Sequence, residues 1–407
     1  MTATPNLPWL TIVGIGEDGV GGLSEAALRA ITAAEVLVGG ERHLAMVPDQ
    51  EAERLVWPSP FNALIEKLER RRRARVCVLA SGDPMLYGVG TTLLKHFPVG
   101  ETVVIPAPSA FALACARLGW ARADVECLTL HGRPVELLHP AVQPGACILA
   151  LSADGTTPAR VAALLRGRGY GPSRVTVLER MGHAFQETRV EGTAADWVDQ
   201  PHADLNTIAV ECVAEPGVPL LPRVPGLPDE AFRHDGQITK REVRAVTLAA
   251  LAPVPGQTLW DVGAGCGSIA IEWMRAAPRA RAMAIEPRAD RLALIAGNAA
   301  ALGVPGLRIV EGTAPAALNA LPAPDAVFVG GGMTAPGVVE ACWDALPPGG
   351  RFVANAVTLE GEQALIGLYA RLGGSLTQLS VSRAANLGSF SGWQPFRPVT
   401  QLAVVKP

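Results

Sequence analysis

Short apolar runs alternate with helix-like stretches along most of the chain, and this alternation restricts the possible folds severely. In the first half the runs occupy residues 10–16, 76–82, 102–109, 146–152, 175–180 and 207–212. A second series occupies residues 258–265, 281–287, 307–313, 325–332 and 351–357. Near-continuous apolar strands separated by helices are typical of parallel sheets covered on both faces. The sequence therefore predicts an α/β fold in each half.

The two series are separated by a segment with regularly spaced prolines. They recur at every third position, as Pro216, Pro219, Pro222, Pro225 and Pro228. This is the period of a polyproline II helix, which makes a semi-rigid spacer. A chain of 407 residues also exceeds the size of one ordinary domain. We therefore expect two domains, 1–214 and 229–407, joined by an exposed linker at 215–228.

Composition and charge exclude several classes of protein. No apolar run approaches the roughly 20 residues of a membrane span, so no membrane partner is expected. Residues 1–10 hold two prolines and no basic flank before an apolar core, unlike a secretion signal, which predicts a cytoplasmic location. A net charge of −3 argues against nucleic-acid binding. The seven cysteines include no C-x-x-C pair, and no histidines cluster, so neither disulfides nor a metal site are expected.

A glycine-rich loop follows the first strand of the second series. It reads DVGAGCGS over residues 261–268 and opens a predicted helix. Gly263, Gly265 and Gly267 would let the backbone turn sharply and approach a ligand with no Cβ in the way. Glu286 ends the next predicted strand, where a carboxylate can accept both hydroxyls of a ribose. The loop therefore predicts a nucleoside-containing cofactor.

Two details favour S-adenosylmethionine over a dinucleotide. Asp261 precedes the first glycine, where its carboxylate can order a cationic amino-acid ligand and would repel a pyrophosphate. The spacing G-x-G-x-G also differs from the dinucleotide form G-x-G-x-x-G, because residue 268 is not glycine. A methyltransferase is therefore the first interpretation, and a nicotinamide-dependent reductase is the alternative.

Further segments of the second half carry a family resemblance. They are QITKREVR at 237–244, AIEP at 284–287, EGTAPAAL at 311–318, FVGGG at 328–332 and ANAVTLE at 354–360. With the glycine loop they resemble the decarboxylating half of the precorrin C5,15-methyltransferases, which implies a Rossmann-like class I methyltransferase fold. The family often carries an acidic residue where Thr313 stands. The resemblance implies cofactor contacts by Thr239, Gly312, Thr313 and Ala314, and substrate contacts by Lys240, Arg241 and Asn355.

The first half resembles a different class. VGIG at 13–16, ASGDP at 80–84, VIPAPSAFALACARLGW at 104–120 and LHGR at 130–133 are similar to tetrapyrrole methylases, whose two-lobed fold binds the cofactor between its lobes. The resemblance implies cofactor contacts by Gly14, Gly16, Ser81, Gly82, Asp83, Pro84 and Ser109. His131 and Arg133 are candidates for binding substrate carboxylates, or form a turn that only closes a strand. Many members read G-x-G-P-G-D at the first loop, whereas this chain lacks the proline.

Together the two resemblances imply one pathway reaction. The fusion implies methylation of precorrin-6B at C5 by the first half and at C15 by the second, with loss of carbon dioxide from the C12 acetate, giving precorrin-8 for cobalamin biosynthesis. We expect two S-adenosylmethionine sites per chain, a tetrapyrrole substrate and a homo-oligomer. Electron-rich meso carbons of the substrate can attack the methyl group directly, so no catalytic residue is predicted. A non-catalytic cofactor-binding scaffold is a further alternative.

Overall fold

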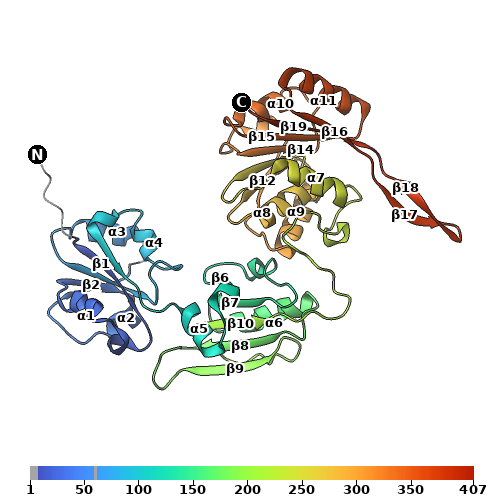
Figure 1. Cartoon of the computed structure of the whole chain (residues 1–407). Coiled ribbons are helices and arrows are strands. Elements are labelled where there is room, and N and C mark those ends of the chain that lie inside the picture. Colours follow the sequence, from blue (N-terminus) through green and yellow to red (C-terminus); the bar gives the residue numbers. More distant parts are fainter. Residues whose placement is uncertain (1–7, 59–61) are drawn as a thin grey trace, which may run out of the picture. The chain divides into compact units, whose positions relative to one another are not determined.

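The structure is a computed structural model that describes residues 8–58 and 62–407. It contains two compact units (Figure 1), one formed by residues 1–135 with 144–218 and the other by 136–143 with 219–407. Most of residues 1–10, on which the predicted cytoplasmic location rests, lie outside the described part. Among the described residues no helix combines the length and the apolar character needed to cross a membrane.

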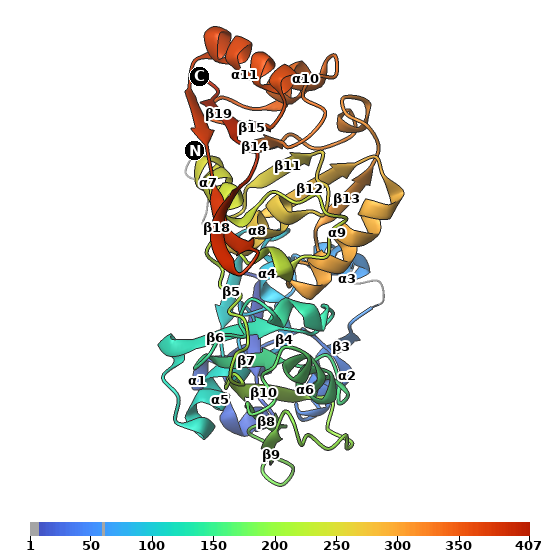
Figure 2. The ribbon, with the colours of Figure 1, turned by 90° about the vertical axis from the view of Figure 1, so that its right-hand side faces the viewer.

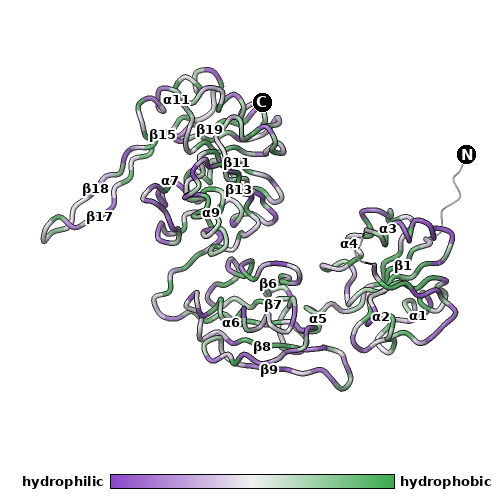
Figure 3. The backbone as a smooth tube through the Cα atoms, turned by 180° about the vertical axis from the view of Figure 1, so that it is seen from behind, coloured by the Kyte–Doolittle hydropathy of each residue, from purple (hydrophilic) through white to green (hydrophobic). Residues whose placement is uncertain are grey.

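The first lobe of the N-terminal unit is a parallel sheet. Its strands, in the order β3-β2-β4-β1-β5, are β1 (Leu10–Ile15), β2 (Val36–Gly39), β3 (Glu53–Val56), β4 (Val76–Ser81) and β5 (Thr102–Ile105). Its helices are α1 (Glu25–Thr32), α2 (Glu41–Ala45), α3 (Asn62–Glu69) and α4 (Gly90–Leu93). Separate apolar clusters cover its two faces, and Figure 3 shows the hydrophobic character of β1. Burial on both faces explains why these strands read as continuous apolar runs.

The second lobe differs from the predicted parallel arrangement. Its strands, in the order β6-β7-β10-β8-β9, are β6 (Val125–Thr129), β7 (Cys147–Leu151), β8 (Arg174–Glu179), β9 (Thr188–Thr193) and β10 (Asn206–Glu211). Its helices are α5 (Ala110–Leu118) and α6 (Thr157–Gly167). Only β6 and β7 pair in parallel, and the other three pairings are antiparallel. The expectation of a parallel sheet is wrong here, because β9 and β10 follow β8 without the helix that a parallel crossover needs.

The C-terminal unit is built on a seven-stranded sheet with the order β13-β12-β11-β14-β15-β19-β16. The strands are β11 (Thr258–Val262), β12 (Arg281–Glu286), β13 (Arg308–Glu311), β14 (Ala326–Val329), β15 (Arg351–Ala356), β16 (Ser375–Leu379) and β19 (Val399–Val405). The helices are α7 (Arg241–Leu251), α8 (Ser268–Ala276), α9 (Ala289–Ala301), α10 (Val338–Ala345) and α11 (Leu359–Leu372). Two apolar clusters separate the layers, with α7–α9 on one face and α10 and α11 on the other (Figure 2).

The strand order places a switch point between β11 and β14. From β11 the chain proceeds outward to β12 and β13, then returns to β14 on the other side. The five strands β11 to β15 are parallel, whereas β19 is antiparallel to both β15 and β16. Open α/β sheets bind ligands beyond the carboxyl ends of the strands at such a switch. The fold therefore points to this edge of the sheet.

A two-stranded hairpin projects from the C-terminal unit (Figure 1). It consists of β17 (Ser382–Leu387) and β18 (Phe390–Pro395), paired antiparallel with each other and with no other described strand. Its exposed side chains give no alternating apolar pattern, so the sequence analysis did not identify it.

The proline-rich segment is not an exposed spacer along its whole length. Leu227 is buried in the core against α8, and the backbone N–H of Gly226 donates to Glu272 Oε2 at 2.6 Å. The guanidinium of Arg275 donates to the carbonyl of Leu221 at 2.8 Å. The expectation of exposed backbone is therefore wrong at Gly226 and Leu227, where the Leu227 side chain is buried with that unit, whereas Pro222, Arg223 and Val224 are exposed as expected.

Candidate active site

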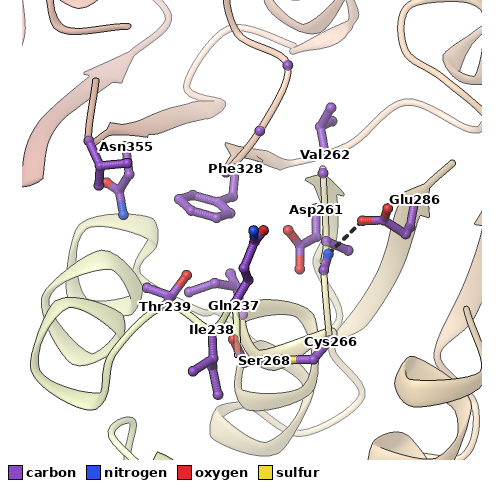
Figure 4. Close-up of a pocket in the computed structure, with 18 of the residues that line it drawn as sticks. Gln237, Ile238, Thr239, Asp261, Val262, Cys266, Ser268, Glu286, Phe328 and Asn355 are labelled. Atoms are coloured by element: carbon purple, nitrogen blue, oxygen red, sulfur yellow. Dashed lines mark hydrogen bonds between the residues drawn. The ribbon is translucent and has the colours of Figure 1, made fainter. Parts of the chain in front are cut away.

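A cavity of about 800 Å³ lies in the C-terminal unit at the carboxyl ends of the parallel strands (Figure 4). Its size falls within the roughly 300–1,000 Å³ of small-molecule sites. Segments far apart in the sequence line it, including 236–240, 261–266, 312–314, 330–332 and 396–397. The cavity therefore collects most of the C-terminal residues that the sequence analysis selected.

Glycine is required at the three positions of the loop for different structural reasons. All have positive φ, of 72° at Gly263, 60° at Gly265 and 80° at Gly267. A Cβ on Gly263 would lie 2.8 Å from the backbone of Gly331, and one on Gly267 would crowd Ile295 at 3.1 Å. A Cβ on Gly265 would meet no protein atom within 4 Å. Gly263 and Gly265 line the cavity and Gly267 does not, so Gly265 is the position where a side chain would enter the ligand space.

Glu286 is fixed at the end of β12. It is buried, and its Oε2 accepts a hydrogen bond from the backbone N–H of Gly265 at 2.8 Å (Figure 4). Its Oε1 accepts from the N–H of Arg288 at 3.3 Å. The carboxylate thus lines the cavity in a fixed orientation and keeps acceptor capacity for a ligand.

Asp261 is almost completely buried at the end of β11. Its Oδ2 accepts from the backbone N–H of Ala270 at 3.0 Å, whereas its Oδ1 has no hydrogen-bond partner among the described residues. Burial, with a smaller effect of the nearby Glu286, raises the pKa of Asp261 to about 7. A buried carboxylate oxygen without a partner, beside a cavity, fits a ligand that carries a positive charge.

The residues of segment 237–244 have two different roles. Thr239 and Lys240 line the cavity together with Gln237, whose side chain points into it (Figure 4). Arg241 is exposed and does not line it. Arg244 is completely buried and holds the segment in place. It donates to Glu272 Oε1 at 2.6 Å and to Asp229 Oδ1 at 3.2 Å.

The remaining predicted residues of this half also reach the cavity. Gly312, Thr313 and Ala314 line it after β13. Asn355 lines it at the end of β15, but its side chain is already occupied. Its Nδ2 donates to Thr247 Oγ1 at 2.9 Å, and its Oδ1 accepts from Gln401 Nε2 at 2.8 Å. A direct contact between Asn355 and substrate would require breaking one of these bonds.

Several lining residues were not predicted. Among them are Phe328 near the end of β14 with Gly330–Gly332 just after it, and Val381, Phe396 and Arg397 at the base of the hairpin. The FVGGG run contained a signal for the first segment, since its glycines follow a strand. The second segment gave none, because only the antiparallel strand β19 returns it to this edge of the sheet.

Backbone contacts hold together the N-terminal loops at the ends of β1, β4 and β5. A Cβ on Gly14 would lie 1.9 Å from the carbonyl oxygen of Gly82. The N–H of Gly82 donates to the carbonyl of Ile15 at 3.0 Å, and its own carbonyl accepts from Ala107 at 3.2 Å. Gly14 and Gly82 therefore permit the close approach of three loops, which a larger residue would prevent.

The other predicted residues of these loops have local partners. Ser81 Oγ accepts from Arg42 Nη2 at 3.0 Å and lies 2.9 Å from His43 Nε2. Asp83 accepts from the N–H of Met85 at 2.8 Å, and Ser109 caps α5. Gly16 follows β1, where a Cβ would meet only the flexible Asp18 side chain within 3 Å. The carbonyl of Pro84 accepts from the N–H of Gly90 at 3.0 Å. The structure brings these loops together, and their cofactor contacts remain a prediction.

His131 and Arg133 lie on an exposed turn after β6. Gly132 between them has φ of 65°, and the His131 N–H donates to Thr129 Oγ1 at 3.2 Å. The Arg133 guanidinium lies 5.7 Å from the centre of the Tyr87 ring. The geometry is that of a turn, and substrate binding by these two residues remains a prediction.

Comparisons with known proteins assign both halves. The tetrapyrrole (corrin/porphyrin) methylase model matches residues 9–197, and the precorrin methyltransferase domain model matches 230–406. A precorrin-6Y C(5,15)-methyltransferase [decarboxylating] from Sinorhizobium sp is 48% identical over 400 residues, covering 98% of this chain and 97% of that protein. The chain belongs to this family. The two-lobed tetrapyrrole methylase fold followed by a Rossmann-like methyltransferase fold is thereby confirmed.

Two shorter relatives each cover about half of the chain. A cobalt-precorrin-7 C(5)-methyltransferase from Salmonella typhimurium is 32% identical over 201 residues, which are 49% of this chain and 98% of that protein. A probable cobalt-precorrin-6B C(15)-methyltransferase (decarboxylating) from Pyrobaculum calidifontis is 36% identical over 182 residues, which are 43% of this chain and 93% of that protein. Members of the decarboxylating C5,15-methyltransferase family are enzymes that use S-adenosylmethionine, so the reductase and scaffold alternatives do not apply.

Proposed function

We propose that this chain methylates precorrin-6B at C5 and C15 and removes the C12 acetate carboxyl group as carbon dioxide, giving precorrin-8 in cobalamin biosynthesis. The observation that carries the proposal is the relative that is 48% identical along nearly the full length of both chains and is named for a decarboxylating C5,15-methyltransferase. The cavity with Asp261, Gly265 and Glu286 is consistent with it, because these residues suit a cofactor with a cationic group and a ribose.

The two halves divide the work. The N-terminal domain, 1–214, methylates C5, and the C-terminal domain, 229–407, methylates C15 and carries out the decarboxylation. Support comes from the two half-length relatives, one named for C5 methylation and the other for C15 methylation with decarboxylation. The halves also match different families, so they are not two copies of one active site. This too supports a separate reaction for each half.

Each chain binds two molecules of S-adenosylmethionine, which supplies the methyl group when bound. In the C-terminal cavity Asp261 Oδ1 binds a positive group of the cofactor, Glu286 accepts the ribose hydroxyls and Gly265 leaves room for both. Thr239, Gly312, Thr313 and Ala314 complete this site. In the N-terminal domain the second site is formed by the loops that carry Gly14, Gly16, Ser81, Gly82, Asp83, Pro84 and Ser109.

The C-terminal cavity acts mainly by positioning the reactants and excluding water. Among its described lining residues the carboxylates are Asp261 and Glu286, and both belong to the cofactor side. A meso carbon of the reduced macrocycle is itself nucleophilic, so the chain has no proton to remove before attack. When carbon dioxide leaves, the electron pair of the broken carbon–carbon bond remains on the substrate, where a protonated macrocycle can accept it.

The enzyme is a homo-oligomer, and the hairpin β17–β18 is its contact surface. Leu387, Phe390 and Trp393 on the hairpin are 69%, 76% and 78% exposed. A two-stranded hairpin is only marginally stable by itself, and large apolar side chains on such an arm favour burial against another chain. A second copy of the same hairpin offers the matching apolar side chains and free strand edges.

Mass spectrometry of precorrin-6B incubated with the full-length protein and S-adenosylmethionine tests the function. The product should carry two added methyl groups and should have lost one carbon dioxide. A product with a single methyl group or an intact acetate carboxyl would contradict the proposal.

A further inference from the structure

The C-terminal cavity has two chemically different sides. The loops after β11, β12 and β13 present Asp261, Glu286 and the backbone of the glycine loop. The part of the lining near β15, β16, β19 and the base of the hairpin is mainly apolar, with Val357, Leu379, Val381, Phe396 and Val399. An apolar wall in the same cavity as a cofactor loop suits the face of a macrocycle better than it suits a second nucleoside.

Two cations line this apolar side without a carboxylate partner. Within the described part of the chain, neither the Lys240 ammonium nor the exposed Arg397 guanidinium forms a hydrogen bond or an ion pair. The Lys240 ammonium lies 5.9 Å from the centre of the Phe396 ring. Arg291, the third cation of the lining, is paired with Asp235 at 2.9 Å. Unlike Arg291, the side chains of Lys240 and Arg397 therefore remain available at the cavity for an anionic ligand.

Hydrogen bonds hold the base of the hairpin against the start of α7. Arg383 on β17 donates to both carboxylate oxygens of Glu242, at 3.1 and 2.7 Å, and to Asp229 at 3.0 Å. Its guanidinium lies 5.1 Å from the centre of the Phe396 ring. The N–H of Phe396 also donates to the carbonyl of Val381 at 2.9 Å. Lys240 is the N-cap residue of α7, and Arg397 directly follows Phe396 at the hairpin base. The two cations therefore lie on two elements, α7 and the hairpin base, that these hydrogen bonds join.

We propose that Phe396, Arg397 and Lys240 form the substrate subsite of this cavity. Phe396 packs on the tetrapyrrole ring, and the two cations bind its peripheral carboxylates, which turns C15 toward the cofactor loop. A guanidinium binds a carboxylate through two parallel hydrogen bonds and so fixes orientation as well as affinity. This inference rests on the proposed function and adds residues of the hairpin base to it.

The test uses Arg397→Gln and Lys240→Gln in the full-length chain, with Arg371→Gln as control. Arg371 is an exposed arginine at the end of α11, outside the cavity lining. The measurements are the KM and kcat for carbon dioxide release from precorrin-6B at several salt concentrations, and the affinity for S-adenosylhomocysteine. We expect each cavity variant to raise KM about tenfold or more and to weaken its salt dependence, with S-adenosylhomocysteine affinity retained. Arg397→Lys should recover part of the loss, because it keeps the charge.

The outcomes separate this inference from the proposed function. An active parent protein whose KM and salt dependence are unchanged by Arg397→Gln would overturn the subsite alone. An equal rise of KM in Arg371→Gln would also overturn it, since the effect would then reflect overall charge. A parent protein that binds S-adenosylhomocysteine but releases no carbon dioxide from precorrin-6B would overturn the proposed function and the subsite with it.

Discussion

Glu286 combines a structural hydrogen bond with a proposed ligand contact, so the choice of substitution matters. Glu286→Gln keeps an acceptor for the Gly265 N–H, at 2.8 Å in this structure, and removes the charge. We expect it to weaken cofactor binding in the C-terminal site by about 1–1.5 kcal/mol, the difference between charged and neutral hydrogen bonds. Calorimetric titration with S-adenosylhomocysteine measures this, and an unchanged affinity in that site would remove Glu286 from the ribose contact.

Asp261 makes cofactor binding depend on pH. Burial raises the pKa of Asp261 to about 7, so below that pH the empty site holds a neutral carboxyl group. A cationic ligand requires the carboxylate, and each binding event then releases a proton. Affinity should therefore fall as pH decreases below 7, by at most about tenfold per pH unit. Titrations at pH 6 and pH 8 measure this dependence in the wild type, and Asp261→Asn should abolish it.

The same carboxyl group affects stability with the opposite sign from an ordinary paired aspartate. Its folded pKa lies above the usual value, so the folded state binds more protons, and stability is lost as pH rises from about 4 to about 7. Asp261→Asn removes this penalty and should raise the melting temperature of the unliganded protein at pH 8, while weakening the cofactor. A lower melting temperature in a folded Asp261→Asn protein at pH 8 would contradict an unpaired buried charge.

At the scale of elements, the packed part of the linker determines where the C-terminal domain begins. A fragment that starts at residue 219 keeps Leu227 and the two N–H groups that donate to Glu272, whereas one that starts at 229 loses them. Burial of one leucine and satisfaction of a buried carboxylate together contribute about 3 kcal/mol or more. Differential scanning calorimetry should show a clearly lower melting temperature for the shorter fragment, and equal stability would mean that residues 221–227 pack only weakly.

The hairpin gives a test of self-association. A triple variant with Leu387→Ser, Phe390→Ser and Trp393→Ser should be monomeric in analytical ultracentrifugation, while the wild type forms a larger species. Phe185→Ser is the control, because Phe185 is also highly exposed and lies in the N-terminal unit. A monomeric wild type, or a triple variant of unchanged size, would contradict contact through the hairpin.

How much could be predicted from the sequence varies between elements. Strands buried on both faces, such as β1 and β11, appear as continuous apolar runs, and the residues at their ends could be located. β9 and the hairpin strands have exposed side chains and short connections, so neither run length nor periodicity marks them. Arg244 was quoted within a motif, but only the structure reveals that it is buried against Glu272. The sequence could not relate Arg397 to the glycine loop, because the two reach one cavity only through the pairing of β19 in the folded sheet.

For the whole molecule, we expect two cofactor sites per chain, because two different methyltransferase folds stand on one polypeptide. Gly265→Asp should exclude the cofactor without unfolding the protein, since a side chain there enters the cavity and aspartate tolerates positive φ. Gly16→Asp should displace only the flexible Asp18 and obstruct the N-terminal loop. Gly297→Asp, on the exposed face of α9, supplies the same charge change as a control. Titration with S-adenosylhomocysteine should give two sites for the wild type and one for each loop variant.

The products of these variants test the division of labour most directly. Precorrin-6B and S-adenosylmethionine are incubated with each folded variant, and the products are analysed by mass spectrometry and by NMR of the macrocycle. Gly265→Asp should leave C15 unmethylated and the C12 acetate intact. Gly16→Asp should give a product methylated at C15 only, with the acetate carboxyl lost as carbon dioxide. A Gly265→Asp product that lacks the C12 carboxyl, or loss of C15 methylation in Gly16→Asp, would contradict two independent active sites.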